Sequence, residues 1–216
     1  MNIHLALPAV TLGVLEADAI QVSLVNEPLA HEMDAICDEK RRALTLESLA
    51  DSSPVRAVRE MFRRWGLDPS KYRPSSEALL RRVIQGKGLY RVSNVVDIGN
   101  IGSIETGWPF GCYDRSKLHP PITFRHGAPG ETYEGIGKRT WHLEGRPVLA
   151  DSQGPFGSPI SDSTRSMVTE SAHDILVVIY APAMADDASI TSVLDRLASR
   201  LSRFAATTAT RALICR

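Results

Sequence analysis

Two kinds of hydrophobic repeat interleave along this chain without a regular strand-helix-strand order, and this interleaving limits the fold more than any other feature. Short aliphatic and β-branched runs predict strands at residues 3–7, 11–15, 20–25, 122–125, 148–151, 175–181 and 212–215. Stripes spaced by three and four residues predict helices at residues 28–49, 53–66, 75–86, 94–107 and 189–204. This order favours an α+β fold, with a mixed or antiparallel sheet covered by helices, over a doubly wound parallel sheet.

Length and apolar content indicate a single compact domain over residues 1–216. At 43% apolar residues, such a chain buries a sizeable core without help from disulfides or metals. Its three cysteines, Cys37, Cys112 and Cys215, are far apart and form no Cys-x-x-Cys pair, which is typical of a reducing compartment. No basic run precedes the first apolar stretch, and no window reaches the roughly 18 apolar residues of a membrane span. We therefore expect a cytoplasmic protein that neither enters a membrane nor is secreted.

Positive charge is concentrated in one part of a chain whose formal net charge is zero. Between Lys40 and Arg91 the sequence has thirteen lysines and arginines against five aspartates and glutamates. Clustered cations bind polyanions because they release counterions from phosphates, so this segment points to RNA. The residues predicted to bind RNA are Arg63, Arg64, Arg81, Arg82 and Lys87. The alternative is that these charges form the solvated faces of amphipathic helices.

Standard motifs for metals, nucleotides and activated nucleophiles are missing from the sequence. Six histidines include no His-x-x-x-His pair, and the glycines form neither a dinucleotide-binding nor a phosphate-binding loop. No Gly-x-Ser-x-Gly elbow occurs, and a role for Cys112 in catalysis needs a histidine that the sequence does not place beside it. We therefore expect no cofactor and no metal.

The densest group of small and polar residues lies between Asn94 and Asp114. On a helix that starts at Asn94, the side chains of Asp97, Asn100 and Ser103 follow at spacings of three and share one face. Glycines within the same helix, at positions 99 and 102, cost helix stability and suggest the close approach of a backbone or a ligand. This face is predicted to meet a polar ligand. The alternative is that these side chains cap the helix and bond to the backbone.

These residues also carry a resemblance to a known family. The run from Arg81 to Asp97, followed by Asn100, Glu105-Thr-Gly-Trp-Pro109 and Tyr113-Asp114, resembles the editing domain of the phenylalanyl-tRNA synthetase beta subunit. The likeness covers residues 74–180 and includes Gly154-Pro-Phe-Gly157. Residues 1–73 add strands and helices, and residues 181–216 add a helix and a strand, so that the whole chain is similar to free-standing relatives of that domain.

The resemblance implies a site that hydrolyses the ester of tRNA wrongly charged with tyrosine, by means of a positioned water and stabilisation of the oxyanion. The pocket histidine of the family falls at Gly111 in this sequence. The residues that we assign to catalysis are Asn100, Asp162 and Arg165. Those assigned to substrate binding are Asn94, Asp97, Ser103, Glu105, Gly111, Glu131 and Gly157.

Two functions stay open from the sequence. The first is an aminoacyl-tRNA deacylase that edits mischarged tRNA in trans. The second is a non-catalytic module that binds RNA, a free amino acid or a similar small ligand. The partner predicted for the first function is aminoacyl-tRNA, and the oligomeric state is not predicted. Because few aromatic residues accompany the arginines, structured RNA is favoured over single strands.

Overall fold

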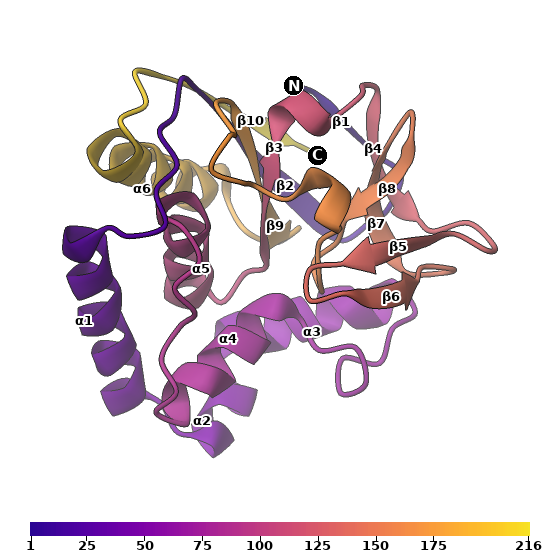
Figure 1. Ribbon diagram of the computed structural model, residues 1–216. Helices are drawn as coiled ribbons and strands as arrows, with labels where there is room; N and C mark the ends of the chain where they lie inside the picture. Colours follow the sequence, from indigo (N-terminus) through magenta and orange to yellow (C-terminus); the bar gives the residue numbers. More distant parts are fainter.

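The computed structural model describes residues 1–216 and contains two four-stranded sheets and a separate two-stranded hairpin (Figure 1). The central sheet is antiparallel and has the order β10-β2-β9-β3, formed by Ala209–Cys215, Val10–Asp18, Ile175–Pro182 and Phe110–Asp114. The outer sheet has the order β1-β4-β7-β8, formed by Ile3–Leu5, Ile122–His126, Pro147–Asp151 and Gly154–Gly157. In the outer sheet, β1 and β4 are parallel and the other pairs are antiparallel. The hairpin pairs β5 (Thr132–Gly135) with β6 (Arg139–His142).

Six α-helices pack around the sheets. They are α1 (Glu27–Ala43), α2 (Leu46–Asp51), α3 (Ser53–Arg64), α4 (Ser75–Ile84), α5 (Asn94–Thr106) and α6 (Asp187–Ala205). Short 3-10 helices follow β3 at Arg115–Lys117 and β8 at Thr164–Ser166. In Figure 1 the helices α1, α5 and α6 lie on one side of the central sheet, and the outer sheet and the hairpin lie on the other. None of the six helices has both the length and the apolar character that a bilayer crossing requires.

Strand β9 is buried along its whole length because it separates two hydrophobic cores. Its alternate residues Ile175, Val177 and Ile179 face the core beneath the helices. Leu176, Val178 and Tyr180 face the core between the two sheets. Successive side chains of a strand point to opposite faces, so a strand covered on both sides needs apolar residues at nearly every position. This arrangement explains the uninterrupted apolar run at 175–181.

The α+β fold expected from the sequence is confirmed by this architecture. The helix predicted to begin at Asn94 does so, with the Ser93 side chain as its N-cap, and Gly107 ends it in a left-handed conformation with φ of 74°. The glycines inside α5 permit close packing on β3: an added Cβ would lie 2.6 Å from Cys112 Sγ at Gly99 and 2.8 Å from the Phe110 ring at Gly102. The predicted close approach is therefore made by the side chains of β3.

Two predicted elements are wrong. Residues 20–25 form no strand: β2 ends at Asp18, Ala19 has a φ of 53°, and the segment is held by separate bonds such as Gln21 N–H to the Ala205 carbonyl. The predicted helix 28–49 is two helices, because Leu44 is extended and a capping box of Thr45 and Ser48 starts α2. The sequence interpretation also missed β3, β5, β6 and β8, which are short and rich in glycine or exposed residues.

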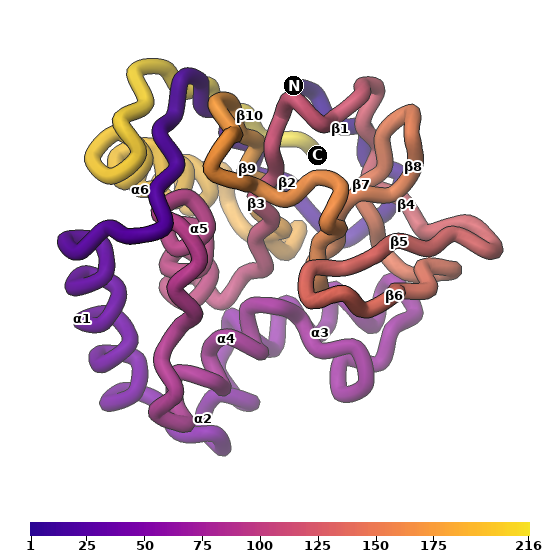
Figure 2. The backbone as a smooth tube through the Cα atoms, in the orientation of Figure 1, coloured from indigo at the N-terminus to yellow at the C-terminus, as the bar shows by residue number.

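The two ends of the chain lie close together, as the tube in Figure 2 shows. Cys215 Sγ lies 3.6 Å from Asn2 Oδ1, and the N-terminal amine of Met1 pairs with Glu16 on β2. The first strand and the last strand therefore close the same side of the molecule.

Candidate functional site

At the start of α5, the polar side chains of Asn94 and Asp97 bond to the backbone, which corrects the expectation that they form a face open to a ligand. Buried Asn94 accepts from Ser23 N–H through Oδ1, and its amide donates to the carbonyls of Gln21 and Phe204, each at 2.8 Å. Asp97 accepts from the Val92 N–H at 3.0 Å. Burial raises the pKa of the Asp97 carboxyl. These side chains fix the segments that surround the start of the helix.

The remaining polar residues of α5 divide between the helix end and the surface. The Ser103 hydroxyl donates to the Trp108 carbonyl at 2.8 Å and fastens the turn after α5. Glu105 accepts two hydrogen bonds from the Arg200 guanidinium of α6, at 2.6 and 2.8 Å. Asn100 is half-buried and its side chain makes no hydrogen bond within the protein. Of the α5 residues assigned to the site, Asn100 is therefore the one whose polar group is not already engaged.

Gly111 and Gly157 enclose the ring of Tyr113 between the two sheets. Gly111 precedes Tyr113 by two residues on β3, and Gly157 ends β8 of the outer sheet. A Cβ added at either glycine would overlap the Tyr113 hydroxyl. The buried ring also packs edge-on against Phe156, with the ring centroids 5.0 Å apart. Two positions predicted to bind substrate thus make room for a side chain of the protein itself.

Asp162 lies at the end of this tyrosine ring. The Tyr113 hydroxyl donates to Asp162 Oδ1 at 2.8 Å, and the Ser158 N–H donates to the same oxygen at 3.1 Å. The Tyr180 hydroxyl lies 3.1 Å from that of Tyr113, while Asp162 Oδ2 has no hydrogen-bond partner in the protein. Burial raises the pKa of Asp162 to about 7, although the two hydrogen bonds oppose this shift. A carboxyl with such a pKa accepts or releases a proton near neutral pH, as a general base or acid must.

The loop that carries Asp162 is held firmly in place. The Ser158 hydroxyl accepts from the Ser161 N–H at 3.1 Å and donates to the Ser161 carbonyl at 2.7 Å. Tyr133 of the hairpin donates to the same carbonyl at 2.5 Å, and burial raises the pKa of Tyr133. The Asp162 carbonyl accepts from the Ile136 N–H at 3.0 Å. The carboxyl is thus positioned by both the outer sheet and the hairpin.

Arg165 and Glu131 have ion-pair partners away from Asp162. Arg165 forms two hydrogen bonds to the buried Asp151 carboxylate, at 3.0 and 3.1 Å, and also donates to the carbonyls of Lys117 and Gly154. Burial favours a higher pKa for Asp151, but the bonds from Arg165 and from backbone N–H groups bring it below its ordinary value. Glu131 pairs with Arg125 at 2.7 and 2.8 Å, which lowers the pKa of Glu131. The structure does not bring these two residues together with Asp162.

No group of three or more histidine, cysteine, aspartate or glutamate side chains has the arrangement of a metal site. Cys112 lies on β3 beside the cluster of Tyr113 and Asp162, but burial raises the pKa of its thiol to about 12. A thiolate nucleophile at this position is therefore disfavoured at neutral pH. Asp162 is the acid or base that this part of the structure offers.

Most of the chain matches one known domain family. Residues 57–212 match the B3/4 domain. The chain belongs to the B3/4 domain family. The resemblance to the phenylalanyl-tRNA synthetase beta subunit that the sequence indicated is confirmed by this match and by the relatives of the chain.

The relatives of this B3/4 domain protein are much longer proteins. The phenylalanine–tRNA ligase beta subunit of Chromobacterium violaceum is 29% identical over 175 residues, which cover 74% of this chain and 22% of that protein. The corresponding subunit of Streptomyces avermitilis is 34% identical over 123 residues, covering 50% of this chain and 14% of that protein. An N-terminal fragment of the beta subunit from Pyrococcus horikoshii aligns with 99% of this chain and 50% of its own, at 13% identity and a TM-score of 0.44. The chain thus corresponds to less than a quarter of each ligase subunit.

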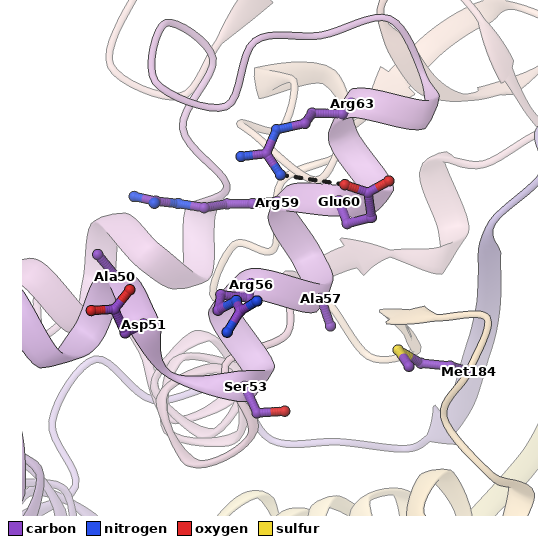
Figure 3. A pocket seen from close by; sticks show the side chains of 9 residues that line it. All are labelled: Ala50, Asp51, Ser53, Arg56, Ala57, Arg59, Glu60, Arg63 and Met184. Atoms are coloured by element: carbon purple, nitrogen blue, oxygen red, sulfur yellow. Dashed lines mark hydrogen bonds and ion pairs between the residues drawn. The ribbon is translucent and has the colours of Figure 1, made fainter.

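The cations predicted to bind RNA fall into two places on this B3/4 domain protein. Arg81, Arg82 and Lys87 line one depression of about 370 Å³ at the end of α4. Arg63 lies on α3 and lines a wider depression of about 700 Å³, shown in Figure 3, where its guanidinium is 3.3 Å from Glu60. Arg64 also pairs with Glu60, at 3.6 Å. The depression at the end of α4 has no carboxylate in its lining, although Arg81 pairs with the buried Glu77, whereas both α3 arginines pair with Glu60.

Several residues of the candidate site were missed in the sequence. Tyr113 enters the sequence prediction only as part of a motif, and no role is predicted for Tyr180, Tyr133 or Ser158. The signal that was present was Tyr180, a hydroxyl within the otherwise apolar run of β9, because a buried hydroxyl needs a hydrogen-bond partner. Nothing in the sequence indicates that its partner network reaches Asp162.

Proposed function

We propose that this B3/4 domain protein acts in the cytoplasm as an aminoacyl-tRNA deacylase, which hydrolyses the ester of mischarged tRNA in trans. The observation that carries the proposal is Asp162, a carboxyl with a pKa of about 7 that is held by the Tyr113 hydroxyl through one oxygen and is free at the other. An aminoacyl ester is already activated, so a positioned water and a base suffice for its hydrolysis.

In the proposed reaction, Asp162 Oδ2 takes a proton from a water whose oxygen forms a bond to the ester carbonyl carbon. The ester carbon–oxygen bond then breaks, and the same proton passes to the leaving ribose oxygen. Tyr113 and the Ser158 N–H act as positioning groups because they fix Oδ1 and thereby direct Oδ2. Asn100 is retained as a predicted polar contact to the substrate. Arg165 is retained as a positioning residue, since it fastens the start of β8 through Gly154 and Asp151.

The membership in a family found within phenylalanine–tRNA ligase beta subunits supports tRNA as the partner. The cations of α4 support a contact with the phosphate backbone, because three of them line one depression that no carboxylate lines. Under this proposal Arg81, Arg82 and Lys87 make the main contacts with the RNA backbone, and Arg63 and Arg64 contribute less.

The second candidate function is binding without hydrolysis, and one observation favours it. The Tyr113 ring occupies the space between Gly111 and Gly157, where the resemblance places the amino-acid pocket. If the ring stays there with RNA bound, the protein holds tRNA but does not admit the amino acid.

The experiment that separates the two functions uses a panel of tRNAs charged with matched and mismatched amino acids, incubated with the purified protein at neutral pH in the presence of a chelator. Selective loss of one mischarged ester supports the deacylase. The matched variant is Asp162→Asn, which keeps the shape and the acceptor for Tyr113 but removes the base. Full activity in Asp162→Asn combined with Asn100→Ala would exclude the proposed site, and binding without hydrolysis across the panel would establish the second function.

A further inference from the structure

Two adjoining depressions run along the surface from the α3–α4 linker to the end of α4. The first, of about 440 Å³, is lined by Lys71, Arg73, Arg139 and Arg146 together with Tyr72 and Trp141. The second is the depression of Arg81, Arg82 and Lys87, which is also lined by Arg73 and Tyr90. Because Arg73 lines both, we treat them as one surface and name it the basic groove.

The basic groove has seven cations and no carboxylate in its lining. Beneath it, buried Glu77 pairs with Arg81 at 2.8 Å and lies 3.9 Å from Arg73. The other five cations, Lys71, Arg82, Lys87, Arg139 and Arg146, form no ion pair. Arg82 Nε is buried and has no hydrogen-bond partner at all. A surface with this much uncompensated charge favours an anionic ligand with several charges.

Aromatic rings lie among these cations. The Arg146 guanidinium lies 4.5 Å from the centre of the Tyr72 ring and 5.8 Å from that of Trp141. Arg139 lies 4.7 Å from the Trp141 ring, and Arg82 lies 3.9 Å from the Tyr90 ring. Planar guanidinium groups and aromatic rings are the surfaces on which unpaired bases stack.

The fold assembles this group from distant parts of the chain. Tyr72 lies in the linker between α3 and α4, and Trp141 lies on β6, which runs beside that linker in Figure 1. Trp141 rests on Gly135 of the partner strand, where an added Cβ would lie 2.5 Å from the indole. Gly135 thus allows the indole to lie close against the partner strand, with Arg139 and Arg146 beside the ring.

The basic groove reaches the loop of Asp162. Ile160 lines its first depression and precedes Asp162 by two residues in the loop that Ser158 and Tyr133 hold. The lining of the groove and the carboxyl of the candidate site therefore share one loop.

We propose that the basic groove binds an unpaired RNA strand, with phosphates on the cations and bases stacked at Tyr72, Trp141 and Tyr90. This inference rests on the proposed function for the identity of the RNA, since the amino acid of a charged tRNA is attached to its unpaired 3′ end. It replaces the expectation of structured RNA, which depended on the scarcity of aromatic residues near the arginines in the sequence. In the structure, three aromatic residues line the basic groove.

The test uses uncharged RNA, so that it does not depend on hydrolysis. A fluorescein-labelled single-stranded oligouridylate of about ten nucleotides is titrated with the full chain, next to a blunt RNA duplex with the same number of phosphates. We expect the single strand to bind at least about tenfold more tightly than the duplex. Trp141→Ala is expected to weaken its binding by about 5- to 150-fold, as for the loss of one stacked base, and Trp141→Phe to restore most of it.

Two further variants guard against a loss of folding in the hairpin. Lys71→Ala and Arg139→Ala remove exposed cations of the groove, and Arg211→Ala removes an exposed cation on β10 as a matched control. Equal binding of duplex and single strand, or unchanged binding in Trp141→Ala and in both groove cation variants, would overturn the proposal. Hydrolysis of charged tRNA without binding of the single strand would support the deacylase proposal and exclude RNA binding by the groove. Binding of the strand without hydrolysis would support RNA binding by the groove and exclude the deacylase proposal.

Discussion

The space between the two sheets and the basic groove both place aromatic rings beside charged groups, yet they differ in how their polar groups are partnered. Between the sheets, the hydroxyls of Tyr113 and Tyr180 and the carboxyl of Asp162 bond to one another. In the basic groove, five cations have no carboxylate partner and the Nε of Arg82 has no partner of any kind. Most polar groups between the sheets are hydrogen-bonded within the protein, whereas most cations of the groove remain available to a ligand.

This difference predicts which property, stability or binding, a substitution in each region will change. A buried polar cluster is part of the packing, so changes in it alter the free energy of unfolding along with any chemistry. An exposed row of cations contributes little to stability, so changes in it alter binding and its dependence on salt. The predictions below test this separation, beginning with the largest expected effect.

The first prediction concerns the chemistry of Asp162. The carboxyl acts as a base only when ionised, and its pKa is about 7, so the rate of ester hydrolysis should rise by about 50-fold between about pH 5 and pH 7 and level off above about pH 8. Asp162→Asn should lower the rate by about 10²- to 10⁴-fold at neutral pH. Rates on one charged tRNA, corrected for spontaneous hydrolysis, measure both. A flat profile in the native protein would remove Asp162 as the base.

The second prediction concerns the Tyr113 ring. Tyr113→Ala should reduce the free energy of unfolding by about 3–5 kcal/mol, since it empties the space that Gly111 and Gly157 leave for the ring. Tyr113→Phe keeps the ring and loses the hydroxyl, and should cost about 1–3 kcal/mol. Urea unfolding of both variants gives the two values. A cost below about 1 kcal/mol for Tyr113→Ala would mean that the ring is not part of the packing.

The third prediction concerns the dependence of stability on pH. The folded pKa of Asp162 is about 7 against an ordinary value of 3.8, so the folded state holds the proton more tightly than the unfolded state. The stability from this group is fully present below about pH 4 and is lost as the pH rises through about 7. Relative to the native protein, Asp162→Asn should therefore be more stable at about pH 8 than at about pH 5. Urea titrations of both proteins at the two pH values test this prediction. The same difference in free energy of unfolding at both pH values would contradict the raised pKa of Asp162.

The last prediction compares cations inside and outside the basic groove. Arg139→Ala should reduce the salt dependence of single-strand binding by about 0.7 in the slope of log K against log salt, the value for one phosphate contact on a single strand. The double variant Arg63→Ala with Arg64→Ala should change the slope by less, because Glu60 pairs with both arginines. Titrations at several salt concentrations measure the slopes. A larger effect from the α3 pair would place the RNA along α3 and not along the groove.

Local interactions explain which parts of the fold were predictable. Helix α5 begins at Asn94 and ends at Gly107 because the Ser93 cap and a left-handed glycine act within one turn of the chain. Strand β9 was also predicted, since burial on both faces imposes a long apolar run. The hairpin of β5 and β6 was missed because most of its residues are exposed and each strand has a single large aromatic residue, Tyr133 or Trp141.

The candidate site was predicted less well because its interactions join distant segments of the chain. Asp162 is predicted from its place after a glycine-rich turn, but its raised pKa arises from burial in the fold, against which the hydrogen bond from Tyr113 acts. Asn94 and Asp97 were chosen as a ligand face, and the structure shows them bonded to the backbone of neighbouring segments. A polar residue looks the same in the sequence whether it binds a ligand or bonds to the backbone. The partner that distinguishes the two roles lies in a distant segment of the chain.

The sequence by itself determined the family, the α+β class and the ends of its best-capped helices, because these depend on residue type and on spacings of a few positions. The tertiary structure alone decided that Tyr113 fills the space between two glycines and that Tyr72 and Trp141 both lie beside the unpaired Arg146. The physical reason is that burial, pKa and charge compensation depend on what lies within a few ångströms in space. Neighbours such as Tyr113 and Gly157, or Tyr72 and Trp141, come from segments that are about 40 to 70 residues apart in the chain.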